Sequence, residues 1–330
     1  MSSIRPDPNL LKKYPNAITQ ADIDRRNRFL GVLPGLAIGD ALGAPVEFQS
    51  AEAVAAAHPD GVREITGGGV WEKGEPTDDT QLALLLAESL ALSGRLDVTD
   101  LARRLVAWLE SNPKDIGNLT RQSLQNLRGG DPPDQCGAIA WEDSGRNSAG
   151  NGSLMYVAPI ALANLLRPGE LAEDATTVSR ITHYDPRCVG ACVALTHAIA
   201  GLLRGEDDAL ASAAQAAQGV CDDVRATVER ALARPPAALK VDGADRGYVL
   251  VTLELAFSAA AFAADFESAL VEVVSKGGDA DTNGAVAGAL LGAKFGRNQI
   301  PERWLTAAQA VPRLTALGEK LHRMVTGKGR

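Results

Sequence analysis

Two segments of the chain carry glycines at a spacing of four residues, and this feature limits the possible folds more than any other. The glycines are Gly35, Gly39 and Gly43 in the first segment and Gly284, Gly288 and Gly292 in the second. Residues four apart share one face of an α-helix, so each set would form a smooth stripe that a neighbouring backbone can approach closely. Plain packing explains such stripes, and the same packing would bring the ends of helices close together.

Helical patterns follow one another along the whole chain, and alternating strand-like runs are almost absent. The segment 99–110 places its leucines and Trp108 on one face, as an amphipathic surface helix does, whereas 82–87 is apolar all round and belongs in the interior. Aromatic residues make up only 4 % of the chain, so the core must consist mainly of Ala, Leu and Val. We predict an all-α fold. Further helices are expected at 23–42, 118–127, 154–166, 172–181, 189–203, 222–233, 248–264, 266–274, 283–295 and 304–324.

The chain shows no fixed-period repeat and no break in composition that would mark a domain boundary. Its 330 residues allow one large domain or two ordinary ones. A single domain over residues 1–330 is the economical interpretation, with 1–22 as a loosely attached N-terminal extension. Two irregular stretches rich in Gly, Pro and Asp, 62–71 and 128–152, are predicted to be loops over a cleft.

The overall charge and the cysteines limit the possible partners. A formal net charge of −8 argues against binding to nucleic acid or to an anionic membrane. Four cysteines without a C-x-x-C pair are typical of a reducing compartment. The chain starts without a signal-peptide pattern, and the apolar stretch 249–264 is too short for a membrane span. We expect a cytoplasmic monomer with no nucleic-acid or membrane partner.

Two short clusters of oxygen-bearing side chains carry the strongest chemical signal. Thr77, Asp78 and Asp79 precede an apolar run, and the Gly-rich turn 275–285 contains Asp279, Asp281 and Thr282. Each cluster opens a predicted helix, where Asp and Thr are common as capping residues, but capping needs one oxygen and not three. Carboxylates and hydroxyls without Cys or His are the ligands of hard cations such as Mg²⁺, Ca²⁺ and Mn²⁺. Four converging carboxylates would repel one another without cations, so we predict a binuclear site.

Other familiar chemistries lack support in the sequence. The glycines at 150–152 are not followed by the third glycine of a dinucleotide-binding fingerprint, and those at 67–69 are not followed by the Gly-Lys-Thr of a phosphate-binding P-loop. No Gly-x-Ser-x-Gly motif supports a serine hydrolase. Metal-assisted hydrolysis is the candidate chemistry that remains.

Five ordered segments together resemble the ADP-ribosylglycohydrolase family. The segments are Gly39–Glu47, Thr77–Thr80, Gly150–Met155, Thr182–Tyr184 and Gly278–Thr282. The resemblance extends from about residue 28 to about residue 296 and covers nearly the whole chain. It implies a compact orthogonal bundle of many helices with a binuclear metal cleft.

The resemblance also implies an activity and a set of metal ligands. Members of the family cleave the glycosidic bond between the distal ribose of ADP-ribose and a protein side chain or related acceptor, with two Mg²⁺ or Mn²⁺ ions. The residues that match the metal ligands are Thr77, Asp78, Asp79, Asp279, Asp281 and Thr282. Glu47 matches an acidic residue that gates the site and serves as acid or base. We therefore expect Glu47, Asp78 and Asp281 to act in catalysis.

A further set of residues matches the family's nucleotide site. Gly150, Asn151, Gly152, Ser153 and Met155 correspond to the loop that binds phosphate and ribose, and His183 to a histidine near the nucleotide. Tyr156 stands where many members carry Arg. An aromatic side chain there would stack on adenine or ribose, or would indicate a different ligand. The expected partner is ADP-ribose or an ADP-ribosylated protein.

Two alternatives stay open. The family includes crystallin-like members, so an ADP-ribose-binding or structural protein without turnover is one alternative; the intact acidic set and Glu47 favour the enzyme. A metal-dependent phosphohydrolase is the other, although such enzymes commonly have His-rich metal sites. Product analysis separates glycosidic cleavage, which releases ADP-ribose, from pyrophosphate cleavage, which releases AMP.

Overall fold

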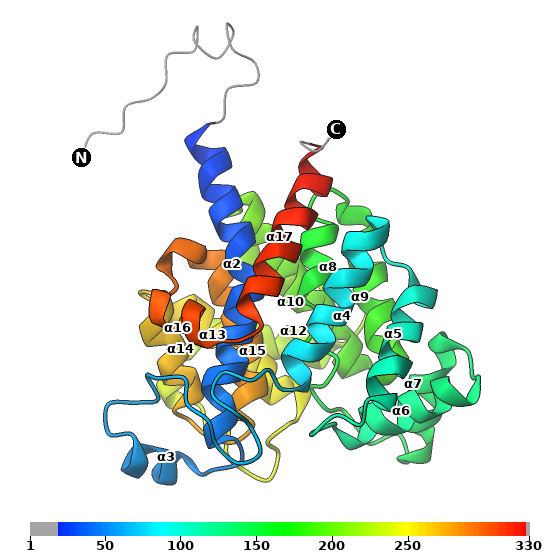
Figure 1. Ribbon diagram of the computed structural model, residues 1–330, viewed down its shortest axis with the longest axis horizontal. Coiled ribbons are helices and arrows are strands. Elements are labelled where there is room, and N and C mark those ends of the chain that lie inside the picture. The colour runs from blue at the N-terminus through cyan, green and yellow to red at the C-terminus, as the bar shows by residue number, and fades with distance from the viewer. Residues whose placement is uncertain (1–18, 328–330) are drawn as a thin grey trace, which may run out of the picture.

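The computed structural model describes residues 19–327, which form a bundle of helices (Figure 1). This part of the chain contains sixteen α-helices and three short 3-10 helices, and no β-strand. The all-α prediction is confirmed. The α-helices are α2 (Gln20–Gly43), α3 (Ala51–Ala57), α4 (Asp78–Ser93), α5 (Val98–Glu110), α6 (Asn118–Gly129), α7 (Pro133–Asp143), α8 (Ala158–Ala163), α9 (Pro168–Thr182), α10 (Pro186–Arg204), α11 (Ala209–Ala216), α12 (Asp222–Ala233), α13 (Val249–Phe262), α14 (Phe266–Val274), α15 (Ala280–Phe295), α16 (Glu302–Ala307) and α17 (Val311–Thr326). The 3-10 helices are η1 (Ala44–Val46), η2 (Pro236–Ala238) and η3 (Arg297–Gln299).

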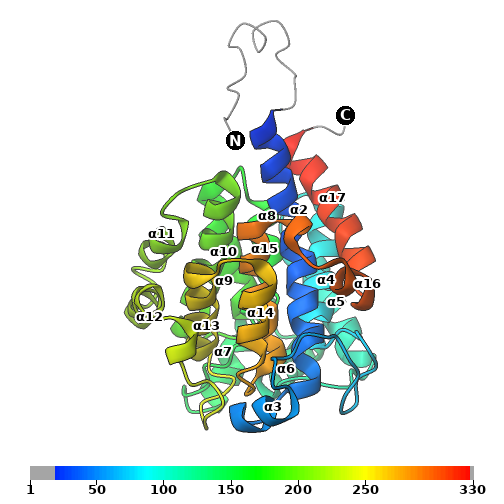
Figure 2. The same ribbon diagram turned by 90° about the vertical axis from the view of Figure 1, so that its left-hand side faces the viewer.

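Helices α2 and α15 lie side by side at the centre of the bundle (Figure 2). Their glycine stripes face each other. A methyl group on Gly39 would lie 1.8 Å from the carbonyl oxygen of Gly284, and one on Gly288 would lie 2.1 Å from that of Gly35. Only glycine allows the two backbones to come this close. The paired numbers run in opposite directions, so the helices are antiparallel. The C-terminal end of α2 therefore lies beside the N-terminal end of α15.

The start of α2 is held by a capping box. The Thr19 side chain accepts a hydrogen bond from the backbone N–H of Asp22, and the Asp22 carboxylate accepts one from the backbone N–H of Thr19. These reciprocal bonds satisfy N–H groups that a helix start otherwise leaves free. Residues 19–22 thus belong to the helix, and the remainder of the predicted extension, 1–18, lies outside the described residues.

Three sequence-based boundaries were wrong. The segment 304–324 is divided into α16 and α17, because Pro312 in the first turn of α17 has no N–H with which to continue an incoming helix. The helix expected at 154–166 is only α8, six residues long. The loop predicted at 128–152 contains α7, which has Pro133 as its first residue.

Two helical segments, 20–46 and Pro186–Arg204, are long and apolar enough to cross a membrane by length and composition alone. Within the structure, 94 % and 78 % of their most apolar windows are buried by other helices. Core helices of this kind pass the same test, so it is weak evidence for a membrane span. The apolar stretch at 249–264 corresponds to the shorter helix α13.

Candidate metal centre and substrate cleft

The structure brings the two acidic clusters together. Asp79 stands in the first turn of α4 and Thr282 in the first turn of α15, 203 residues further along the chain. The Thr282 hydroxyl donates to Asp79 Oδ2 at 3.3 Å. Asp79 is 1 % exposed and Asp281 2 % exposed. Because α2 and α15 pack closely side by side, the start of α15 can lie opposite the start of α4.

Capping accounts for only part of the contacts of these side chains. Asp279 is the N-cap residue of α15, but its side chain makes no capping bond. Instead its Oδ2 accepts a hydrogen bond of 2.6 Å from the Asn151 amide, which also donates to the hydroxyl of Thr252 at 2.9 Å. At α4, the hydroxyl of Thr77 lies 3.4 Å from the backbone N of Asp79 and donates to Asp79 Oδ2 at 3.1 Å. Asp79 and Asp279 thus accept hydrogen bonds from hydroxyl and amide side chains and do not cap their own helices.

Glu47 completes the acidic group. It follows η1, and one oxygen each of Glu47, Asp279 and Asp281 lie within 4.8 Å of one another. Two backbone hydrogen bonds tie its loop to the start of α15: Phe48 N–H donates to Gly278 O at 2.6 Å, and Gly278 N–H donates to Gln49 O at 2.8 Å. This geometry permits Glu47 to serve as a metal ligand as well as an acid or base.

Burial and mutual repulsion shift the pKa values of these carboxyl groups upward. Burial, then the charges of Asp279 and Asp115, raise the pKa of Glu47 to about 8. Burial, then Asp115 and other carboxylates, raise that of Asp78 to about 7. The pKa values of Asp79 and Asp281 are also raised well above the usual range, first by burial. A cation among these groups would favour their charged forms and reverse the shifts.

The residues present fit a hard divalent cation. Asp79 Oδ1 is buried and has no hydrogen-bond partner, which is costly for a carboxylate oxygen unless an ion occupies the space beside it. The surrounding donors are carboxylates and threonine hydroxyls, the ligand chemistry of Mg²⁺ and Mn²⁺. Of the six predicted ligands, Asp279 and Asp281 lie together with Glu47, and Thr77 and Thr282 both contact Asp79; the full ligand set stays a prediction.

A cavity of about 290 Å³ opens beside the acidic group. Its lining combines residues of the acidic group, the Gly150 loop and three further loops. The lining residues are Glu47, Phe48, Asp78, Asp115, Gly117, Asn118, Leu119, Thr120, Gly150, Asn151, Gly152, Met155, His183, Arg246, Gly247, Asp279, Asp281 and Thr282. Most of the predicted substrate residues thus share one cleft with the predicted metal ligands.

His183 forms part of the wall of this cleft. It is 2 % exposed, its Nδ1 shares a hydrogen bond with the Thr182 hydroxyl at 2.9 Å, and burial lowers its pKa to about 4. The imidazole is therefore neutral at pH 7. A side chain at Gly152 would come within 2.8 Å of this ring, so glycine is needed there to keep the ring in place.

Two predicted substrate residues lie in the core and not in the cleft. Ser153 is fully buried, and its hydroxyl lies 2.9 Å from that of Ser179. Tyr156 is also fully buried, and its hydroxyl donates to Val178 O at 3.4 Å. The predicted stacking of Tyr156 on a ligand is thus wrong, because a side chain with no exposed surface offers no ring face to a nucleotide.

Sequence reasoning missed three charged residues at or behind the cleft. Asp115 and Arg246 line its mouth, and the Arg246 guanidinium lies 5.5 Å from the centre of the exposed Phe48 ring. Nothing in their local sequence distinguishes them. Asp40 is fully buried behind the start of α4. The sequence contained a signal for Asp40, because it is the only charged residue from Phe29 to Gly43.

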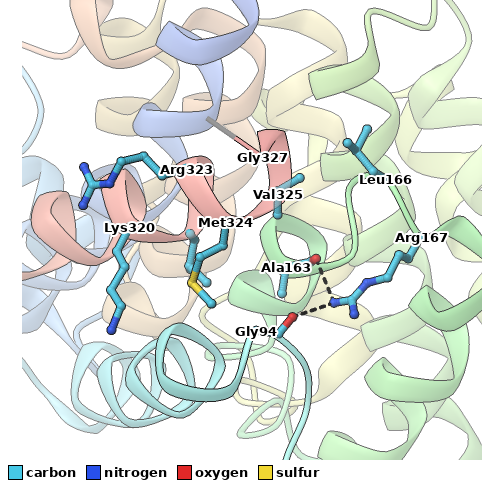
Figure 3. A pocket seen from close by; sticks show the side chains of 10 residues that line it. Gly94, Ala163, Leu166, Arg167, Lys320, Arg323, Met324, Val325 and Gly327 are labelled. Atoms are coloured by element: carbon cyan, nitrogen blue, oxygen red, sulfur yellow. Dashed lines mark hydrogen bonds between the residues drawn. The ribbon is translucent and has the colours of Figure 1, made fainter. Parts of the chain in front are cut away.

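A second hollow lies at the other end of α4, away from the acidic group (Figure 3). It is bordered by the turn after α4, the turn between α8 and α9, and α17. The Arg167 guanidinium spans part of this border and donates to Gly94 O at 3.0 Å and Ala163 O at 3.1 Å. Among residues 19–327, no carboxylate lines this hollow.

Comparison with known proteins agrees with this geometry. The profile of the ADP-ribosylglycohydrolase family matches residues 21–330. The chain is 34 % identical to the ADP-ribosyl-[dinitrogen reductase] glycohydrolase of Rhodospirillum rubrum over 85 % of this chain and 90 % of that one. It is 31 % identical to the ADP-ribosylarginine hydrolase Tri1 of Serratia proteamaculans over 89 % and 78 % of the two chains. A solved structure of an "ADP-ribosylglycohydrolase-related protein complex" aligns with a TM-score of 0.76 and 35 % identity, covering 92 % of this chain and 99 % of that one.

Proposed function

Since the chain belongs to the ADP-ribosylglycohydrolase family and is a hydrolase of ADP-ribosyl linkages, we propose that its reaction uses two divalent cations, Mg²⁺ or Mn²⁺, and releases ADP-ribose from protein arginine. One observation carries the metal part of this proposal: Asp79 Oδ1 is buried without a partner where the starts of α4 and α15 meet. The six predicted ligands would hold the ions. When bound, such ions orient the ribose hydroxyls and lower the pKa of a bound water.

Glu47 is the candidate acid or base. Cleavage of the bond between ribose C1 and the acceptor builds positive charge on the sugar, and a proton must reach the leaving group. With its pKa raised to about 8 by burial and then by Asp279 and Asp115, Glu47 holds a proton at neutral pH in the metal-free protein. In that state it donates a proton; as a carboxylate it accepts one from the attacking water.

The Gly150 loop and His183 are suited to the nucleotide part of the substrate. Glycines at 150 and 152 let the backbone come close to a pyrophosphate, as in other phosphate-binding loops. The neutral imidazole of His183 adds a hydrogen-bonding group without adding charge. The overall negative charge of the protein makes such local recognition necessary.

The choice of arginine as the acceptor rests on charge. Asp115 lines the cleft together with Glu47 and Asp78, and these carboxyl groups outnumber the one guanidinium in the lining, that of Arg246. A guanidinium is a planar cation with several N–H donors that match carboxylate oxygens, whereas a serine linkage carries no charge. An acidic mouth therefore favours an arginine-linked substrate. The printed name of the Serratia relative, an ADP-ribosylarginine hydrolase, agrees with this choice.

The first test is release of free ADP-ribose from arginine-linked and serine-linked ADP-ribosyl proteins, each with Mg²⁺, with Mn²⁺ and with EDTA. We expect metal-dependent release from the arginine linkage. Faster release from the serine linkage would refute the acceptor assignment, and AMP as the product would identify a phosphohydrolase. Tight ADP-ribose binding without release would show a binding protein. Calorimetric titration of the metal-free protein with Mn²⁺ tests the ion sites independently of turnover.

A further inference from the structure

Asp40 is a buried carboxylate without an assigned role. It lies on α2, is 0 % exposed and stands in an otherwise uncharged segment of that helix. A charge in such a place requires compensating hydrogen bonds. Asp40 Oδ2 accepts them from the backbone N–H groups of Thr77, at 3.1 Å, and Thr80, at 3.3 Å. Both donors belong to the start of α4.

These two N–H groups are the ones that a capping box normally satisfies within a single helix. In that arrangement the N-cap side chain accepts from the third helical N–H, and the third residue's side chain accepts from the N-cap N–H. Thr77 is the N-cap residue of α4, and Thr80 is its third residue. Asp40 accepts from both, so one carboxylate on α2 takes over both roles.

This arrangement leaves the Thr77 hydroxyl available for the acidic group. An N-cap threonine commonly turns its oxygen toward the second or third N–H of its helix. Here the third N–H is already bonded to Asp40, and the Thr77 hydroxyl donates to Asp79 Oδ2 at 3.1 Å. Its contact with the second N–H, at 3.4 Å, is long. The Thr77 side chain also interacts with the Asp40 carboxyl group, so its hydroxyl lies between Asp40 and Asp79.

We propose that Asp40 is a positioning residue for the cation site, which caps α4 from α2 and so keeps the Thr77 hydroxyl directed at the ion. Asp40 follows Gly39, whose backbone packs directly against Gly284 of α15, so Asp40 lies where α2 meets both α4 and α15. Loss of the Asp40 carboxylate frees the N–H of Thr80, and the Thr77 hydroxyl turns to cap it. The inference rests on the proposed function, because it presumes that the site binds divalent cations.

The test is calorimetric titration of metal-free protein with Mn²⁺, for the wild type, Asp40→Ala and Asp40→Asn. We expect Asp40→Ala to weaken ion binding by about 10- to 100-fold, the usual effect of losing a residue that orients a metal ligand. Asp40→Asn keeps one oxygen that can accept from both N–H groups, so its loss should be smaller. The matched control is Asp265→Ala, which removes the exposed cap of α14, a 2.8 Å bond from Ser268 N–H, and should leave ion affinity unchanged.

A double-mutant cycle with Thr77→Val separates positioning from charge. If Asp40 acts through Thr77, adding Asp40→Ala to Thr77→Val should cause little further loss of affinity. Additive losses, or equal losses in Asp40→Ala and Asp40→Asn, would show an effect of charge and overturn the inference. Should Asp40→Ala fail to fold, the cycle with Asp40→Asn decides by the same criterion.

If the wild type binds no Mn²⁺, the proposed function fails. If the wild type binds Mn²⁺ and both Asp40 variants bind it equally well, only this inference fails.

Discussion

The starts of α4 and α15 look alike in sequence, but different parts of the protein hold them. Both have Thr and Asp residues at the end of a loop that leads into an apolar helix. The start of α4 is capped by Asp40, a side chain of another helix. The start of α15 has no side-chain cap; its Asp279 is held by Asn151, from the Gly150 loop that lines the cleft. The part of the acidic group at the start of α4, the α4 half, therefore depends on helix packing. The part at the start of α15, the α15 half, depends on the Gly150 loop.

The contact between Gly39 and Gly284 supports both halves, so its disruption should have the largest effect. A side chain at Gly39 would collide with backbone 1.8 Å away, and backbone cannot rotate aside as a side chain can. We expect Gly39→Val to lower the free energy of unfolding by about 3 kcal/mol or more, at or above the upper end for overpacked cores. Urea unfolding measures this change. The control is Gly129→Ala, at the exposed end of α6 with no atom within 4 Å of the new methyl group, which should be neutral or slightly stabilising.

Glu47→Gln tests the side chain that joins the α4 and α15 halves of the acidic group. Glutamine keeps the size of the side chain but cannot exchange a proton, so we expect turnover to fall by at least about 100-fold. Bound ions should lower the pKa of Glu47 from its ion-free value of about 8, so its titration in the wild-type rate profile should lie below pH 8, and it should be absent in the variant. Rates measured from pH 5 to pH 9 at saturating Mn²⁺ check both points. Unchanged turnover with weakened Mn²⁺ binding would instead make Glu47 a metal ligand alone.

Asn151→Ala should affect the α15 half and leave the α4 half intact. The variant removes the 2.6 Å hydrogen bond that orients Asp279. We expect about a 10-fold loss of Mn²⁺ affinity, together with a higher KM because Asn151 also lines the cleft. Calorimetry and steady-state kinetics report the two effects separately. In a double mutant with Asp40→Ala the losses should add, since the two residues hold different helices; strong non-additivity would contradict the division into two halves.

A further effect is expected on the pH dependence of stability without ions. Glu47 and Asp78 have pKa values of about 8 and about 7 in the folded protein, compared with about 4 in an unfolded chain. Between these values the folded state binds more protons than the unfolded state, so stability should fall as the pH rises from about 4 to about 8. Melting temperatures measured in EDTA should show this slope, and saturating Mn²⁺ should reduce it. A melting temperature in EDTA that rises over this range would contradict the shifts.

Much of the fold could be read from periodicity, because helices with strong patterns are largely local structures. The boundaries predicted for α12 and α14 match the structure. Errors arose where local signals conflict. Pro133 was taken as part of a loop although proline also starts helices, and 304–324 was continued across Pro312.

For the site, residue type was enough to select candidate oxygen ligands but not to place side chains. Asp79, Asp279 and Thr282 could be selected because hard cations require oxygen donors, and the structure brings them together. Tyr156 could not be assigned in this way. Whether its ring faces a cleft or the core depends on how α9 packs against its loop, and that contact is distant in the sequence.

The sequence by itself determined that the chain is helical, that α2 and α15 carry glycine stripes, and that oxygen-bearing side chains stand at the starts of two helices. These properties depend on residue type and spacing, which act over a few residues. Only the tertiary structure decided that the two stripes face each other, that Asp40 caps a helix 37 residues further along the chain, and that Glu47 joins the acidic group. The reason is physical: each of these contacts joins segments far apart in the chain, and their distance is set by the packing of whole helices and not by local preference.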